Sequence, residues 1–105
     1  MKYCIDIDGV IADKDDWSHE DSYKRQKQML LKIKPFKNFI KKINQLHRKG
    51  NVIILHTSRI WKDYEATKLW LKRNKVKYDV LIMAKPLADY YVDDKNLSLG
   101  DFLEC

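Results

Sequence analysis

Cysteine and long apolar runs are scarce in this sequence. Two cysteines are present in 105 residues, Cys4 in an apolar segment and Cys105 at the end, and neither has the spacing of metal ligands or of a CxxC motif. The longest purely aliphatic run, 52–55, is far shorter than the ~20 residues that span a bilayer. We therefore expect free thiols, a cytoplasmic location and no membrane partner.

The sequence also lacks internal repeats, low-complexity tracts and linkers rich in Gly, Ser or Pro. With 45% hydrophobic and 34% charged residues, the composition predicts one compact domain over 1–105. Lys and Arg number 21 against 15 Asp and Glu, and the net charge of +6 favours anionic partners such as phosphorylated metabolites or nucleic acids. Much of this excess falls on the helix predicted after Pro35, where lysines commonly form a solvated face.

Apolar segments with the periods of strands and of helices alternate along the chain. Strands are predicted at 2–7, 52–55, 80–83 and 90–92. One helix is predicted from Pro35, which suits a first helical position, to Gly50, and another from Asp63 to Arg73. This order predicts βαβ units, and hence an α/β fold with a single Rossmann-like parallel sheet flanked by helices.

Polar side chains gather where the predicted strands end. Ligands of an open parallel sheet bind beyond the carboxyl ends of its strands, so these side chains should form one site. In chain order they are Asp6, Asp8, Thr57 or Ser58, Lys85, Asp93 and Asp94. Carboxylates that share a cleft repel one another unless a cation neutralises them. Because Mg²⁺ prefers carboxylate oxygens and shares its coordination with phosphate, we expect a magnesium site.

The chemistry predicted for this site is phosphoryl transfer. Beside a metal and a phosphate, one carboxylate can attack phosphorus and form an aspartyl phosphate that water later hydrolyses. A Thr hydroxyl and a Lys ammonium suit the phosphate oxygens, because phosphoryl transfer depends mainly on positioning and charge neutralisation. Asp6 and Asp8 start on the same side of a strand, since its period is two, and Gly9 permits the turn that brings the second acid back over the first.

These motifs resemble the haloacid dehalogenase superfamily. Residues 5–10, IDIDGV, are similar to its DxDG[TV] signature, and 52–59 to its hydrophobic strand followed by Thr. Lys85 resembles its isolated Lys, and 91–94 its terminal acidic pair. The match runs from residue 2 to about 96, with the motifs in the superfamily's order. The resemblance implies a phosphoric monoester hydrolase with Mg²⁺ as cofactor.

Carried over by position, the resemblance also implies residue roles. Asp6 would attack phosphorus, while Asp8 would protonate the leaving oxygen and later activate water. Thr57, with Ser58 as the alternative, and Lys85 would hold the phosphate. The implied metal ligands are Asp6, the backbone carbonyl of Asp8, and Asp93 directly or through water, with Asp94 in support.

No interval between the motifs is long enough for the full cap domain that many relatives in that superfamily carry. The polar stretch 13–30 is predicted to be a flap-like surface excursion with one helical turn, from which Trp17 and His19 contact substrate. The site is then open, which suits bulky substrates or cover by another copy in a homo-oligomer. Arg59 either reaches the substrate or pairs with a cleft acid.

Three functions remain compatible with these features. The first is hydrolysis of a small phosphorylated metabolite such as a sugar phosphate, since 85–95 resembles small phosphatases associated with capsular polysaccharide synthesis. The second is the same chemistry on a nucleotide or a nucleic-acid end, which the positive charge favours. The third is a non-enzymatic phospho-dependent binding module like a response-regulator receiver. Receivers place the acidic pair before the phosphorylated Asp, however, and the opposite order here favours turnover.

Overall fold

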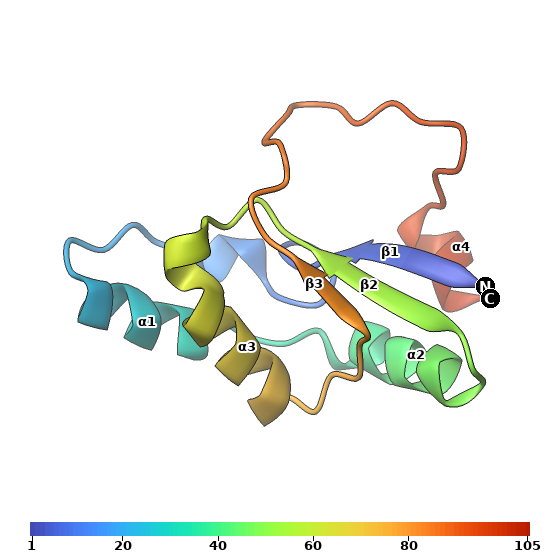
Figure 1. Ribbon diagram of the computed structural model, residues 1–105, viewed down its shortest axis with the longest axis horizontal. Coiled ribbons are helices and arrows are strands. Elements are labelled where there is room, and N and C mark those ends of the chain that lie inside the picture. Colours follow the sequence, from blue (N-terminus) through green and yellow to red (C-terminus); the bar gives the residue numbers. More distant parts are fainter.

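Three apolar segments form the parallel sheet of the computed structural model, which describes residues 1–105 (Figure 1). They are β1 (Lys2–Asp6), β2 (Val52–His56) and β3 (Val80–Ile82), in the order β1-β2-β3. The register pairs Asp6 with His56 and His56 with Ile82, so the carboxyl ends of all three strands meet at one edge. The predicted α/β fold with a Rossmann-like parallel sheet flanked by helices is confirmed.

The helices pack on the sheet and on one another. Helix α1 (Tyr23–Leu31) lies against α3 (Tyr64–Arg73), while α2 (Lys37–Arg48) packs on β2 (Figure 1). The remaining elements are α4 (Leu99–Leu103) and two short 3₁₀ turns, η1 (Lys14–Asp16) and η2 (Trp61–Asp63). None of the helices is long and apolar enough to cross a membrane.

One cluster of 16 buried hydrophobic residues joins these layers. Ile53 and Leu55 of β2 are fully buried, and burial of such side chains contributes about 1.5–3 kcal/mol each. The Trp70 indole N–H donates to the Ile33 carbonyl at 2.9 Å, which ties α3 to the chain that follows α1. Phe102 of α4 is also buried in this cluster, so the C-terminus lies beside the N-terminus (Figure 1). Both cysteines are free, as expected.

Helix α2 begins later than predicted and ends where predicted. Pro35 is not its first residue, because Pro35 pairs with Ala12 in an isolated antiparallel bridge and the helix starts at Lys37. Gly50 follows its last turn with φ of 92°, the left-handed conformation that favours glycine after a helix.

The polar stretch 13–30 contains more helix than the single turn predicted. Helix α1 has nine residues, and the Ser22 hydroxyl caps it by accepting from the Arg25 N–H at 3.1 Å. The residues it buries are Leu30 and the polar Gln26. Because a glutamine occupies one of its inward positions, the apolar period of this helix is hidden in the sequence. Only the part before α1, which includes the short turn η1, forms a surface segment without α-helix.

The strand predicted at 90–92 is absent, and this prediction is wrong. From β3 to α4 the chain runs as an arch outside the sheet (Figure 1). Tyr90 and Val92 are 87% and 95% exposed. Tyr91 instead contacts its own neighbourhood, since its hydroxyl donates to the Pro86 carbonyl and its ring lies 3.9 Å from the Lys85 ammonium. The outer edge of β1 therefore has no partner strand.

Candidate active site

Asp6 and Lys85 form an ion pair where the strands end. Asp6 is the last residue of β1, and its Oδ2 lies 3.2 Å from the Lys85 Nζ. The Asp6 side chain is 36% exposed and that of Lys85 is 12% exposed, so the carboxylate remains the more accessible partner. Asp6 Oδ1 accepts from the Ile7 N–H at 3.1 Å. A carboxylate offers about four lone-pair positions, so these two contacts leave Asp6 free to meet a ligand.

Backbone contacts with the loop after β2 hold Lys85 in place. The Lys85 N–H donates to the Thr57 carbonyl at 2.9 Å, and the Ala84 N–H donates to the Arg59 carbonyl at 2.8 Å. Ala84 has φ of 59°, a left-handed conformation that costs a non-glycine residue about 1–2 kcal/mol. These two hydrogen bonds stabilise the strained turn, which directs Lys85 back toward the end of β1.

Asp8 is held by Arg59 and Thr57, both from the loop after β2. Arg59 Nη2 donates to Asp8 Oδ1 at 2.7 Å and Arg59 Nε donates to Oδ2 at 3.1 Å, which makes a bidentate ion pair. The Thr57 hydroxyl donates to the same Oδ2 at 3.1 Å. The Arg59 side chain is 2% exposed and that of Asp8 is 26% exposed, so only the acid reaches solvent. Arg59 therefore takes the second of its two expected roles and pairs with a cleft acid.

A tight turn after β1 sets the position of Asp8. The Ile7 carbonyl accepts from the N–H groups of 10, 11 and 12 at 3.2, 3.0 and 3.0 Å, and the Gly9 N–H donates to the Ala12 carbonyl at 2.8 Å. Gly9 has φ of 89°, which any side chain would make unfavourable. The predicted need for glycine at this turn is confirmed by that conformation.

The two hydroxyl groups after β2 differ in their access to ligand. Thr57 is fully buried, and its Oγ1 donates to Asp8 and accepts from the Arg59 N–H at 3.1 Å. Ser58 lines the cavity beside the two acids. Thr57 thus positions Asp8 in this structure, and Ser58, the alternative in the sequence analysis, is the hydroxyl that a ligand can reach.

A cavity of about 620 Å³ contains the exposed faces of Asp6 and Asp8. Its wall includes Trp17 and His19, the predicted substrate contacts, which come from the segment between η1 and α1. Tyr91 of the arch completes another part of the wall. The structure therefore brings predicted residues from three distant parts of the chain to one cavity: Asp6, Asp8, Trp17, His19, Ser58 and Arg59.

Asp93 and Asp94 do not line this cavity. Both are exposed in the arch, where Asp93 Oδ1 accepts from the Lys95 N–H at 2.6 Å. The strand that was expected to carry them to the sheet edge is absent. No group of three or more His, Cys, Asp and Glu residues is arranged to hold a metal ion. Of the four carboxylates expected around Mg²⁺, Asp6 and Asp8 meet at the strand ends, where they pair with Lys85 and Arg59, and the other two lie apart in the arch.

Two ionisable residues of the site have no role assigned from the sequence. His56 Nε2 lies 3.5 Å from Lys85 Nζ, and burial, followed by the nearby Lys85 charge, lowers the pKa of His56 below its ordinary value. Asp63 is buried at the start of α3 and lines the cavity, and burial raises the pKa of its carboxyl although Arg59 opposes this shift. The position of His56 at the end of a predicted strand is the sequence feature that could have indicated it as a site residue. For Asp63, the sequence indicated only a helix cap.

Comparison with known proteins establishes the fold. No family model and no curated protein sequence matches the chain. It is similar to the crystal structure of an MCSG target from Vibrio cholerae, with a TM-score of 0.73, 21% identity, and coverage of 99% of this chain and 88% of that one. It is also similar to a chain in the structure of the Pnkp1/Rnl/Hen1 complex, with a TM-score of 0.62, 22% identity, and coverage of 88% of this chain and 30% of that one.

Proposed function

We propose that this protein is a phosphoric monoester hydrolase of the haloacid dehalogenase type, with Asp6 as its nucleophile. The observation that carries this proposal is the meeting of Asp6, Asp8 and Lys85 at the ends of parallel strands, although Lys85 lies 79 positions from Asp6 in the sequence. The three residues hold the positions that the superfamily resemblance assigns to nucleophile, acid and phosphate-binding cation.

The proposed reaction has two steps. An Asp6 oxygen attacks phosphorus, the bond from phosphorus to the leaving oxygen breaks, and that oxygen takes a proton from Asp8. Water then attacks the phosphorus of the aspartyl phosphate and gives its proton to Asp8. The bond from phosphorus to Asp6 breaks, and inorganic phosphate leaves. Lys85 and Ser58 contribute positive charge and a hydrogen bond to the phosphoryl oxygens.

Asp8 keeps the capacity for proton transfer despite its partners. Its Oδ2 accepts from both Arg59 and Thr57, but its Oδ1 accepts only from Arg59. Each carboxylate oxygen has about two lone pairs, so one on Oδ1 remains for the leaving group or for water. The ion pair with Arg59 fixes the orientation of this oxygen.

A small phosphorylated metabolite, such as a sugar phosphate, is the substrate class we favour. Small-molecule sites in proteins occupy about 300–1,000 Å³, and the cavity of about 620 Å³ lies within this range. Trp17 and His19 would contact the part of the substrate that leaves. Because the cavity is open, we also propose that another subunit, such as a second copy of the chain, covers it.

A nucleotide or a nucleic-acid end is the second candidate substrate. The observations that favour it are two lysines in the cavity wall beside the acids of the site, Lys14 and Lys62, and the net charge of +6. Activity on 5′- or 3′-phosphorylated oligonucleotides in excess of activity on sugar phosphates would select this candidate.

Substitution of the nucleophile tests the proposal. Asp6→Asn is expected to lower turnover of para-nitrophenyl phosphate by about 10³-fold or more and to prevent formation of a phosphoenzyme detectable by mass spectrometry. Asp8→Asn should still form the phosphoenzyme, but should hydrolyse it slowly. Asp15→Asn, which changes an exposed acid of η1, is the matched control and should retain full activity. Near-normal turnover by folded Asp6→Asn protein would rule out the assignment, and a long-lived phosphoenzyme in the unsubstituted protein would favour a non-enzymatic phospho-dependent module.

A further inference from the structure

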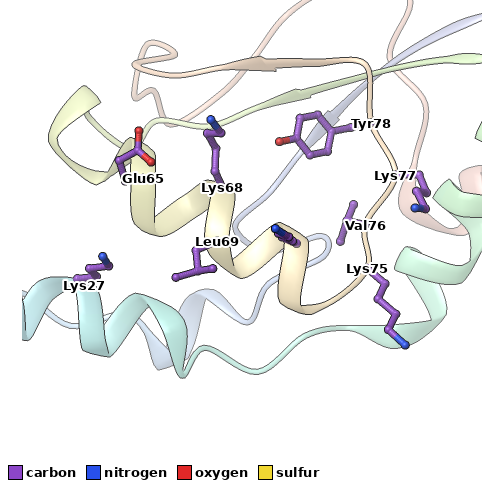
Figure 2. Close-up of a pocket in the computed structure, with 9 residues that line it drawn as sticks. Lys27, Glu65, Lys68, Leu69, Lys75, Val76, Lys77 and Tyr78 are labelled. Atoms are coloured by element: carbon purple, nitrogen blue, oxygen red, sulfur yellow. The ribbon is translucent and has the colours of Figure 1, made fainter.

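A second cavity, separate from the Asp6 site, is bordered mainly by lysines (Figure 2). It has a volume of about 630 Å³ and is formed by α1, α3 and the segment 75–78. We call it the lysine groove. Its charged residues are five lysines and one glutamate: Lys27, Glu65, Lys68, Lys72, Lys75 and Lys77.

Helical spacing places part of this charge on one face of α3. Residues 68 and 69 each lie three or four positions from both 65 and 72, which makes these four residues neighbours on the helix surface. Figure 2 shows Lys27 on the adjacent helix α1, across from Leu69 of this face. The two helices therefore present cations from both sides of the groove.

The positive charge of the lysine groove is offset only by Glu65, which forms no ion pair with any of the five lysines. The protein has three ion pairs, and none of the five lysines takes part in them. Asp79 is close in sequence, but its Oδ2 accepts from the Ile53 N–H at 2.8 Å and its Oδ1 faces His47 at 3.3 Å. Lys68 lies over the ring of Tyr64 at 4.9 Å, a contact that leaves its charge in place. Exposed like charges within a Debye length of about 8–10 Å repel one another, so an anion bound here would relieve that repulsion.

Three apolar residues, one of them aromatic, also line the lysine groove. Its apolar residues are Leu69, Val76 and Tyr78, and Figure 2 shows the Tyr78 ring beside α3 with Val76 below it. Single-stranded nucleic acids are bound by grooves that combine cations for the backbone with aromatic side chains for the bases. A duplex is read by elements that protrude into its grooves, and this surface is concave. An acidic peptide would use the cations but gains little from the aromatic ring.

We propose that the lysine groove binds the phosphate backbone of a single-stranded nucleic acid, with Tyr78 beside its bases. The groove and the Asp6 site share helix α1, since Gln26 lines the Asp6 cavity while the next residue, Lys27, lines the groove. A bound strand that extends past α1 would therefore present an end to the Asp6 site. Binding itself does not depend on the proposed phosphatase chemistry.

Fluorescence anisotropy with a labelled oligothymidylate of about 12 nucleotides tests this proposal. The probe carries no terminal phosphate, so failure of the phosphatase proposal would not affect the result. We expect binding that weakens with salt. In Lys68→Gln/Lys72→Gln protein, affinity should fall about tenfold. The slope of the logarithm of the binding constant against the logarithm of salt concentration should become less steep by about 1.4, or about 0.7 for each lost phosphate contact.

The matched control is Lys41→Gln/Lys49→Gln, which removes the same charge from exposed lysines of and next to α2, outside the groove. This control should bind within about twofold of the unsubstituted protein. If the α3 substitutions disturb the helix, Lys77→Gln, which lies outside any helix, should still lower the slope by about 0.7. Equal losses in both double variants, absence of binding at low salt, or equally strong competition by an oligoglutamate of the same charge would each overturn the proposal.

Discussion

Removal of Asp8 is expected to destabilise the protein more than removal of Arg59, although either substitution breaks the same ion pair. The reason is the difference in exposure, since the Arg59 side chain is 2% exposed and that of Asp8 is 26% exposed. Without Asp8, the guanidinium stays buried and keeps only the Thr67 hydroxyl, at 3.1 Å, as a side-chain hydrogen-bond partner. Without Arg59, the Asp8 carboxylate keeps the Thr57 hydroxyl and can be solvated from the cavity.

The two costs can be estimated from these surroundings. Breaking a buried ion pair from one side costs about 3–5 kcal/mol, and we expect Asp8→Ala at the lower end because Asp8 is partly solvated. Arg59→Met conserves much of the buried volume, and the hydrogen bonds that it loses are to the Asp8 carboxylate, which water can reach. We therefore expect this substitution to lower the free energy of unfolding by about 1–2 kcal/mol. The double variant removes both charges and should be more stable than Asp8→Ala alone.

Urea unfolding measures these differences. For a small protein, the free energy of unfolding falls by about 1–3 kcal/mol for each molar increase in urea. A difference of about 2 kcal/mol in that free energy therefore separates the two unfolding midpoints by roughly 1 M. Asp15→Ala, in an exposed acid, serves as the control and should change stability by less than about 0.5 kcal/mol. Equal costs for the two single variants, or a double variant whose cost is the sum of theirs, would refute the reasoning from burial.

Three further outcomes are expected. From the superfamily resemblance, EDTA should abolish phosphatase turnover and added Mg²⁺ should restore it, whereas full activity after exhaustive chelation would contradict a magnesium cofactor. Replacement of Trp17 and His19 by Ala should raise the KM for the natural substrate and leave turnover of a small activated ester nearly unchanged, while an equal loss of kcat for both would place these residues in the chemistry. The pKa of His56 is lowered below its ordinary 6.5 in the folded state, so its contribution to stability is fully present above that value and is lost as the pH falls through the folded pKa. His56→Gln should therefore lose less stability than the unsubstituted protein between about pH 7 and pH 5, and identical pH profiles would contradict the shift.

The sheet could be predicted from the sequence because the order of apolar and polar residues within each strand segment indicates a buried parallel strand. The continuous apolar run of β2 and the acids that follow β1 both reflect a parallel sheet with its ligand edge at the carboxyl ends of the strands. The same rule placed Asp6 near Lys85 without any knowledge of the register. Parallel pairing of Asp6 with His56, and of His56 with Ile82, then brings the two side chains to within 3.2 Å.

Side-chain direction could not be predicted in the same way. The guanidinium of Arg59 turns toward Asp8 rather than a substrate because Thr67 of α3 accepts a third hydrogen bond from it at 3.1 Å, and the position of Thr67 depends on how α3 packs. The hydroxyl of Thr57 is likewise directed inward by Asp8, which leaves Ser58 at the cavity. These side-chain orientations arise from tertiary contacts between residues that are distant in the sequence and share no local pattern.

The absent fourth strand shows where local propensity is insufficient. Two tyrosines and a valine at 90–92 favour an extended strand, but so short a strand depends for its stability on pairing with a neighbour. In this structure, Tyr91 contacts Lys85 and Pro86, six and five positions away, so these contacts close only a short loop. Pairing with the outer edge of β1 would instead order the whole segment from Pro86 onward, which costs about 1–2 kcal/mol for each residue fixed. The sequence encodes both interactions, and the position of Asp93 depends on the balance between them rather than on the strand pattern alone.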